Sequence, residues 1–243
     1  MYKLIILIIL ICILSYLIHI NSCYKETYDN KNKIAVCMWY DKAIKDYGNI
    51  AKKINKIYCK KHKYDLIYSK KRLLPERHPS WECIPLLLNT LKTNKYDYVI
   101  WIDADACFNL KSTNTIENII NSNKDKDLIF SGDHHTFIIN CGFMILKNSD
   151  ISKQFCENVI NSRKRKECIK HFNNLVWEQA CVIDLYKNNI DNIKNNSVII
   201  PYKILQIFPQ RHKNKIENSI VIHYCGSSRK TRLIGLQNIY KKL

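Results

Sequence analysis

An uncharged run of β-branched and aromatic residues between Tyr98 and Ile102 constrains the fold of this chain most strongly. Continuous apolar runs of this length are typical of strands buried on both faces of a parallel sheet. The run ends in two acidic residues, Asp103 and Asp105, separated by Ala104. In an extended chain such residues face the same side, and ligands of open α/β sheets bind at the carboxyl ends of strands. The two carboxylates are predicted to point at one hard cation, although an acidic turn after a strand gives the same pattern.

Strand and helix patterns alternate around this run. Apolar runs over residues 34–40 and 64–68 predict strands, and periodic apolar residues over 48–61 and 81–91 predict helices, the second with Ser80 as its N-cap. This alternation predicts an α/β domain with a doubly wound, Rossmann-like and mostly parallel sheet and a nucleotide-type crevice.

The second half of the chain has a more mixed pattern. Strands are predicted over residues 127–131, 137–146, 198–201 and 220–224, and helices over 151–163 and 175–186. The chain has neither an internal repeat nor a low-complexity linker. We therefore expect one globular domain over residues 34–243.

The N-terminal stretch over residues 4–20 is almost wholly apolar, with Ser15, Tyr16 and His19 as its only interruptions. Its length is at the short end of the range for a transmembrane helix. Residues 20–23 lack a small-x-small cleavage site, which favours an uncleaved signal anchor over a cleaved signal peptide. Lysines lie on both sides and leave the orientation undecided. The expected organisation is a tail over 1–3, an anchor over 4–20, a stem over 21–33 and the domain over 34–243.

The formal net charge of +18 comes mostly from Lys rather than Arg. Because Asn and Ile are also abundant, this composition is typical of an AT-rich genome, and no Arg-rich run with interleaved aromatic residues indicates nucleic-acid binding. Eleven cysteines include no C-x-x-C pair, which argues against a zinc ribbon or a thioredoxin-type motif. Their spacing gives no disulfide connectivity.

An ordered series of short motifs runs from Tyr58 to Lys230. They are YCKKHKY over residues 58–64, RHPSWECIP over 77–85, WIDADA over 101–106, Asp133 followed by NCGF over 140–143, EQ at 178–179 and HYCG over 223–226. This series resembles glycosyltransferase family 34, which includes fungal α-galactosyltransferases, fungal α-1,6-mannosyltransferases and plant xyloglucan xylosyltransferases. Two positions depart from the family pattern: Cys83 stands where Lys is usual, and Ser227 stands where Cys is common.

The resemblance implies a GT-A-like fold and a metal-dependent transfer of a hexose or pentose from a nucleotide-sugar donor. Asp105 would be the direct metal ligand, Asp103 would share the metal or bond the nucleotide ribose, and His223 would be the third ligand. Carboxylate, imidazole and phosphate donors together suit Mn²⁺, with Mg²⁺ as the alternative.

The resemblance also implies contacts to the donor. Arg229 and Lys230, just past Gly226, would bind the diphosphate. Asn140 and Gly142 would lie under the donor sugar, where glycine allows close approach of the backbone.

Because the family retains the anomeric configuration, no strong base opposite the donor is required. Asp133, Glu178 or Gln179 would instead support the transient sugar cation electrostatically.

Several alternatives stay open from the sequence. The donor is UDP-galactose, GDP-mannose or UDP-xylose, and the acceptor is a glycan or a glycoprotein; the resemblance implies a Golgi or ER lumen. A phosphatase of the haloacid-dehalogenase type also ends a strand on D-x-D, but it requires Thr or Val at the position of Cys107. A basic, membrane-anchored protein that binds nucleic acid or anionic lipid explains the charge and the anchor, and gives Asp103, Asp105 and His223 no role.

Overall fold

The computed structural model describes residues 12–16, 32–134, 137–161, 176–211 and 218–243. The chain divides into two compact units, residues 1–33 and 34–243. Within the first unit residues 12–16 are helical, and the rest of the anchor expected over 4–20 lies outside the described residues. In the part of the chain that is described, no helix has both the length and the apolar character needed to cross a membrane.

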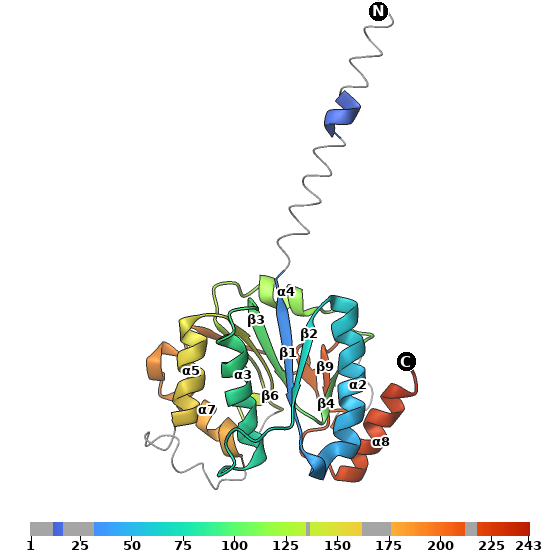
Figure 1. The fold of residues 1–243 in the computed structure, drawn as a ribbon, viewed down its shortest axis with the longest axis vertical. Coiled ribbons are helices and arrows are strands. Elements are labelled where there is room, and N and C mark those ends of the chain that lie inside the picture. Colours follow the sequence, from blue (N-terminus) through green and yellow to red (C-terminus); the bar gives the residue numbers. More distant parts are fainter. Residues whose placement is uncertain (1–11, 17–31, 135–136, 162–175, 212–217) are drawn as a thin grey trace, which may run out of the picture. The chain divides into compact units, whose positions relative to one another are not determined.

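A six-stranded sheet, in the order β2-β1-β3-β6-β5-β7, forms the centre of the second unit (Figure 1). Strands β2 and β3 pair parallel to β1, and β7 pairs parallel to β5, whereas β6 is antiparallel to both β3 and β5. All its strands except β6 therefore run in one direction, as the sequence predicted for a mostly parallel sheet with a mixed second half. The strands are β1 (Ile34–Trp39), β2 (Asp65–Ser69), β3 (Tyr98–Ile102), β5 (Leu128–Ser131), β6 (Asn140–Lys147) and β7 (Ser197–Ile200).

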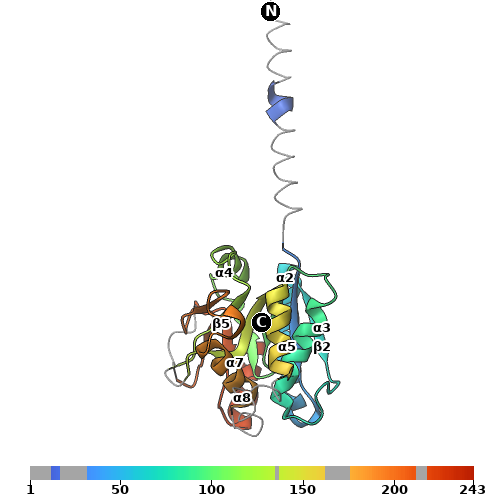
Figure 2. The same cartoon turned by 90° about the vertical axis from the view of Figure 1, so that its left-hand side faces the viewer.

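Helices cover both faces of this sheet, because successive strand residues point to opposite sides. On β3, Ile100 and Ile102 face the core beneath α2 (Lys45–His62), whereas Val99 and Trp101 face the core beneath α3 (Cys83–Leu91). The second face is also covered by α5 (Asp150–Ile160) and α7 (Trp177–Lys187), which lie toward the viewer in Figure 2.

Within residues 34–243 the structure also describes a second, smaller sheet, two further helices and three 3₁₀ turns. A three-stranded sheet has the order β4-β9-β8, with β4 (Ala106–Phe108), β8 (Gln206–Ile207) and β9 (Val221–His223). The other helices are α4 (Ile116–Asn121), α8 (Arg229–Tyr240), which packs on α2, and the 3₁₀ turns η1 (Lys42–Ile44), η2 (Pro79–Glu82) and η4 (Ile190–Asn192). The sequence patterns predicted β9 but none of β4, β8, α4 and α8.

Two local expectations were wrong. Ser80 does not cap the helix that follows it: the His78 ring accepts from the Ser80 backbone N–H, and Pro79 begins the 3₁₀ turn η2 ahead of α3. Proline favours the first helical position, so the residue before it becomes the cap. The strand expected from residue 137 begins at Asn140, opposite Ser131 of β5.

The chain reverses its winding direction at β1. Strand β2 lies on one side of β1 and β3 on the other, while the two connecting helices, α2 and α3, cover opposite faces. Ligands of open α/β sheets bind at such a switch point, outside the carboxyl ends of the strands. Because Asp103 directly follows β3, the acidic pair lies at this switch point.

Candidate active site

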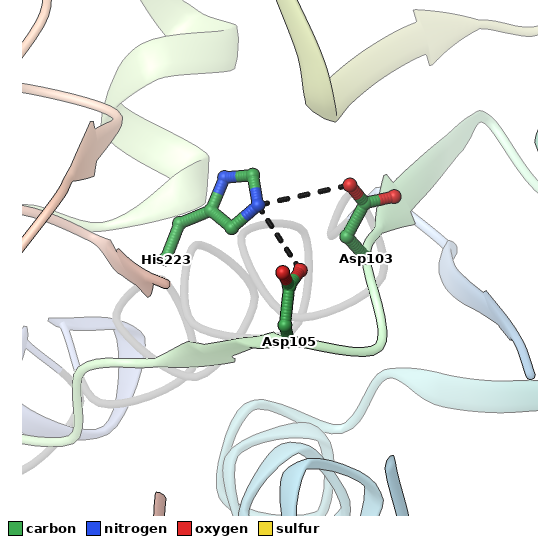
Figure 3. A group of neighbouring side chains, drawn as sticks. All are labelled: Asp103, Asp105 and His223. Atoms are coloured by element: carbon green, nitrogen blue, oxygen red, sulfur yellow. Dashed lines mark hydrogen bonds and ion pairs between the residues drawn. The ribbon is translucent and has the colours of Figure 1, made fainter. Parts of the chain in front are cut away.

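The two acidic residues lie in a tight turn. Strand β3 ends at Ile102, and the Ala106 N–H donates to the Asp103 carbonyl over 3.1 Å, which closes a four-residue turn. The expectation that Asp103 and Asp105 face one side of an extended chain was therefore wrong in its geometry. The turn nevertheless brings both carboxylates to the same imidazole (Figure 3).

That imidazole belongs to His223, which reaches the acids through strand pairing. β4 directly follows the turn and pairs antiparallel with β9, so that Ala106 lies opposite His223, and the Tyr224 N–H donates to the Asp105 carbonyl over 3.0 Å. The His223 Nε2 atom lies 3.1 Å from Asp105 Oδ1 and 3.7 Å from Asp103 Oδ2 (Figure 3). The predicted convergence of these three side chains is confirmed.

Three further side chains hold the cluster in place. The Trp101 indole N–H donates to Asp103 Oδ1 over 2.7 Å, Arg232 Nε lies 2.8 Å from Asp105 Oδ2, and Gln206 Oε1 lies 2.9 Å from His223 Nδ1. The sequence patterns found none of these roles. The role of Trp101 could have been found from the sequence, because this residue precedes Asp103 by only two positions. Gln206 and Arg232 lie on β8 and α8, which were not predicted.

Opposing charges set the protonation of the cluster. Burial disfavours ionisation of Asp105, but His223 and Arg232 outweigh it and lower the pKa of this carboxyl. Burial, assisted by the charge of Asp105, raises the pKa of Asp103. Burial lowers the pKa of His223, but Asp105 outweighs that effect and raises it overall. A positive charge at the imidazole therefore compensates the carboxylates, and a divalent cation would do the same.

The absence of a side chain at Gly142 on β6 leaves space for His223 and Asp103. A Cβ atom at this position would lie 2.2 Å from His223 Cε1 and 2.9 Å from Asp103 Oδ2. Only glycine lets these two side chains lie against the backbone. Close approach at Gly142 was predicted, but the groups found against it are His223 and Asp103.

The donor set fits a divalent metal ion. Ligand atoms of Asp103, Asp105 and His223 lie within 4.8 Å of one another. The exposed fraction of the side chain is 40% for Asp103, 12% for Asp105 and 2% for His223, so a phosphate-bearing ligand would approach over Asp103. Two carboxylates and one imidazole suit Mn²⁺ or Mg²⁺ completed by phosphate or water oxygens.

Glu178 and Gln179 begin α7 on the face of the sheet covered by α3. Gln179 Oε1 accepts from the Cys141 N–H of β6 over 2.9 Å, which places this amide beside Gly142. Glu178 has a buried Oε2 with no hydrogen-bond partner among the described residues. Burial, opposed by a hydrogen bond from Ser80 and assisted by the charge of Asp103, raises the pKa of Glu178 to about 8. Its carboxyl group is therefore mostly neutral at pH 7, which differs from the anionic support that the sequence suggested.

Asn140 and Asp133 are two further candidate site residues. Asn140 Oδ1 accepts from the Gly142 N–H over 3.0 Å, so Asn140 shapes the β6 backbone beneath the site. Asp133 is half-buried, and its charge contributes, after burial and Asp105, to raising the pKa of the Cys225 thiol to about 12.

The basic residues expected at the diphosphate are not the ones that contact the acidic pair. Arg229 Nε pairs with Asp46 Oδ2 of α2 over 2.8 Å, and Lys230 is exposed. Gly226 adopts φ +67° in the exposed turn before α8. The structure instead brings Arg232, one helical turn past Arg229, to Asp105. Donor binding by Arg229, Lys230 and Gly226 stays a prediction.

Comparisons with known proteins identify the fold of this chain. No protein-family model matches the sequence, and no curated protein matches it either. A glycosyltransferase involved in the glycosylation of the major capsid of PBCV-1 is similar in structure, with a TM-score of 0.69 and 16% identity over 85% of this chain and 99% of that one. The fold is that of GT-A-like glycosyltransferases.

Two more distant structures share this fold. The galactosyltransferase LgtC, in complex with donor and acceptor sugar analogues, matches with a TM-score of 0.50 and 11% identity over 86% of this chain and 94% of that one. The glycosyltransferase GlyE of Streptococcus pneumoniae TIGR4 matches with a TM-score of 0.51 and 14% identity over 87% of this chain and 64% of that one. At such identities the likeness establishes the fold and leaves the activity to the geometry of the site.

Proposed function

We propose that this protein is a metal-dependent glycosyltransferase that uses a nucleotide-sugar donor. The observation that carries the proposal is the convergence of Asp103, Asp105 and His223 on one point at the switch point of a GT-A-like sheet. The three residues come from two segments more than a hundred positions apart, and each is held by a partner of its own. Such a pre-organised set of oxygen and nitrogen ligands is suited to a cation that carries a diphosphate.

Transfer of the sugar requires stabilisation of the leaving group. Breaking the anomeric C–O bond leaves negative charge on the departing diphosphate, and a divalent metal ion would act on it as a Lewis acid. Asp105 and His223 would bind that ion from the buried side, and Asp103, oriented by the Trp101 N–H, would complete the set or bond the ribose. Arg232 holds Asp105 in its orientation through a 2.8 Å ion pair.

The sugar would lie toward α7. Gln179 is fixed to the β6 backbone next to Gly142, and Glu178 offers a neutral carboxyl group at pH 7 that can donate a hydrogen bond. The resemblance to glycosyltransferase family 34 adds retention of the anomeric configuration, with Gln179, Glu178 or Asp133 stabilising the sugar cation.

The donor, acceptor and compartment are further parts of the proposal. UDP-galactose, GDP-mannose and UDP-xylose are the candidate donors, and a glycan or glycoprotein is the acceptor. We place the domain in the Golgi or ER lumen, anchored through residues 4–20. The compartment follows from the resemblance alone: Cys181 forms a disulfide bond, but eight other described cysteines are free thiols.

The test is donor hydrolysis by the full chain in detergent micelles. Nucleotide release is measured from each of the three donors with and without Mn²⁺, for the native protein, for Asp105→Asn and for a control, Asp125→Asn. Asp125 is an acidic residue at the surface that pairs with the neighbouring Lys126. We expect metal-dependent release that falls by roughly 10²–10³ in Asp105→Asn, as on removal of an electrostatic catalytic group, and is unchanged in the control. No release from any donor, or equal release by Asp105→Asn, would refute the proposal.

The alternatives predict different results in the same samples. A phosphatase would release inorganic phosphate from a simple phosphate ester. A nucleic-acid-binding protein would bind duplex DNA with a steep dependence on salt.

A further inference from the structure

Gln206 makes a contact that bears on the metal site. This side chain is fully buried on β8, and its Oε1 lies 2.9 Å from Nδ1 of His223, which is itself 1% exposed. Its Nε2 is buried and has no hydrogen-bond partner among the described residues. The carboxamide thus directs its oxygen to the imidazole and leaves its own donor unsatisfied, which costs about 1–3 kcal/mol for a buried group. An unsatisfied group kept in a core calls for a functional explanation.

When the His223 imidazole is neutral, as a metal ligand must be, this contact favours one of the two positions for its single proton. A neutral imidazole has one N–H and one lone pair. An acceptor at Nδ1 retains the proton there and leaves the lone pair on Nε2, the atom that faces Asp103 and Asp105. Without that acceptor the opposite tautomer is favoured, because an Nε2–H can donate to Asp105 Oδ1, 3.1 Å away. A proton on Nε2 would then occupy the position that a metal ion needs.

The strand pairing holds Gln206 at this position. β8 pairs parallel with β9, with Gln206 opposite Val221 and Ile207 opposite Ile222. The Phe208 ring packs edge-on against the imidazole with centroids 5.5 Å apart, and Gly142 leaves room on the β6 side. With the ring packed in this orientation, the hydrogen bond at Nδ1 competes with the one between Nε2 and Asp105 for the single ring proton.

We propose that Gln206 is a positioning residue that holds His223 as the Nδ1–H tautomer and so presents the Nε2 lone pair to the metal ion. This inference rests on the proposed function, because it assigns a purpose to the same site. It adds β8 to the elements that build the site. Gln206 thereby controls metal affinity through His223, without itself being a metal ligand.

The experiment compares two substitutions at one position. Gln206→Glu keeps an acceptor oxygen, whereas Gln206→Leu fills a similar volume and accepts no hydrogen bond. The control is Asn109→Leu, which removes another buried amide, one that donates to the Ser219 carbonyl at the end of the same small sheet. The full chain in micelles is titrated with Mn²⁺ alone, and the free ion is followed by electron paramagnetic resonance. Thermal melting reports folding, and ¹⁵N chemical shifts of the His223 ring in metal-free protein at alkaline pH report the tautomer.

We expect Gln206→Leu to bind Mn²⁺ about 10–100-fold more weakly, the usual effect of losing the partner of a ligating histidine, and to shift the proton to Nε2. Gln206→Glu should keep both affinity and tautomer. Asn109→Leu should lower the melting temperature without changing either. Native-like affinity in folded Gln206→Leu, or equal losses in the Leu and Glu variants, overturns this inference alone. Failure of the native protein to bind Mn²⁺ overturns the proposed function with it.

Discussion

Replacing Glu178 by Gln is expected to stabilise the protein in alkaline solution and to leave its stability unchanged in acid. The side chain is half-buried at the start of α7, its Oε2 has no hydrogen-bond partner among the described residues, and burial raises its pKa from 4.5 to about 8. The folded state therefore holds a proton that the unfolded state releases between these two values. Stability falls as pH rises through that window, since the folded protein binds the extra proton. Glutamine stays neutral and escapes this loss.

The magnitude follows from the two pKa values. They differ by about 3.5, and each unit corresponds to about 1.36 kcal/mol, which gives an upper bound of about 5 kcal/mol above pH 8. Because water reaches part of this side chain, we expect roughly 2–4 kcal/mol. For a domain of about 200 residues each kcal/mol moves the melting temperature by about 2–4 °C, so the variant should melt about 5–15 °C higher at pH 9.

The assay is thermal unfolding of both proteins at intervals from pH 4 to pH 9.5. The difference between the two melting curves removes the effect of all other titrating groups. The control is Glu157→Gln on α5, since Glu157 is 39% exposed and pairs with Lys92 at the surface; this variant should show no gain at high pH. A difference between Glu178→Gln and the native protein that stays constant from pH 5 to pH 9 would show that Glu178 is ionised in the folded protein at neutral pH.

Other substitutions test the cluster and its surroundings. Gly142→Ala should displace His223, abolish Mn²⁺ binding and cost about 1–3 kcal/mol in urea unfolding, whereas Gly226→Ala, strained by its φ of +67° but with open space around it, should cost about 1 kcal/mol and leave binding intact. Arg232→Met should cost about 1–3 kcal/mol because Asp105 Oδ2 loses its partner while Oδ1 keeps His223, and combining it with Asp105→Asn should cost less than the sum in a double-mutant cycle. Reduction of the Cys181 disulfide should lower stability by about 2–4 kcal/mol, measured as the shift of the melting temperature with dithiothreitol.

Residues near one another in sequence were predicted well. The strand before Asp103, the helix over α2 and the strand at β1 follow from uninterrupted apolar runs and helical periodicity, which depend on local composition. The order of these elements fixes the doubly wound arrangement and places the acidic pair at its switch point. The acidic pair could therefore be named as a candidate metal site from its place in the chain, whereas His223 was named only through the resemblance to a family.

Short strands that form only because they pair with a neighbouring strand could not be predicted from the sequence pattern. β4 and β8 have three and two residues, too few for a periodic signal, and each exists because β9 lies beside it. The role expected for Arg229 and the contact found for Arg232 differ by one turn of α8, a helix whose presence the sequence patterns did not indicate.

Local periodicity encodes the layered α/β domain and places Asp103 and Asp105 directly after β3, whereas His223 was assigned to them only through the order of motifs that resembles a known family. Tertiary structure alone decided how these groups are charged and oriented. It placed Gln206 behind the imidazole, Arg232 beside Asp105 and Gly142 under both His223 and Asp103. Distances of a few ångströms between segments far apart in the chain set pKa values and tautomers, and no pattern within one segment specifies them.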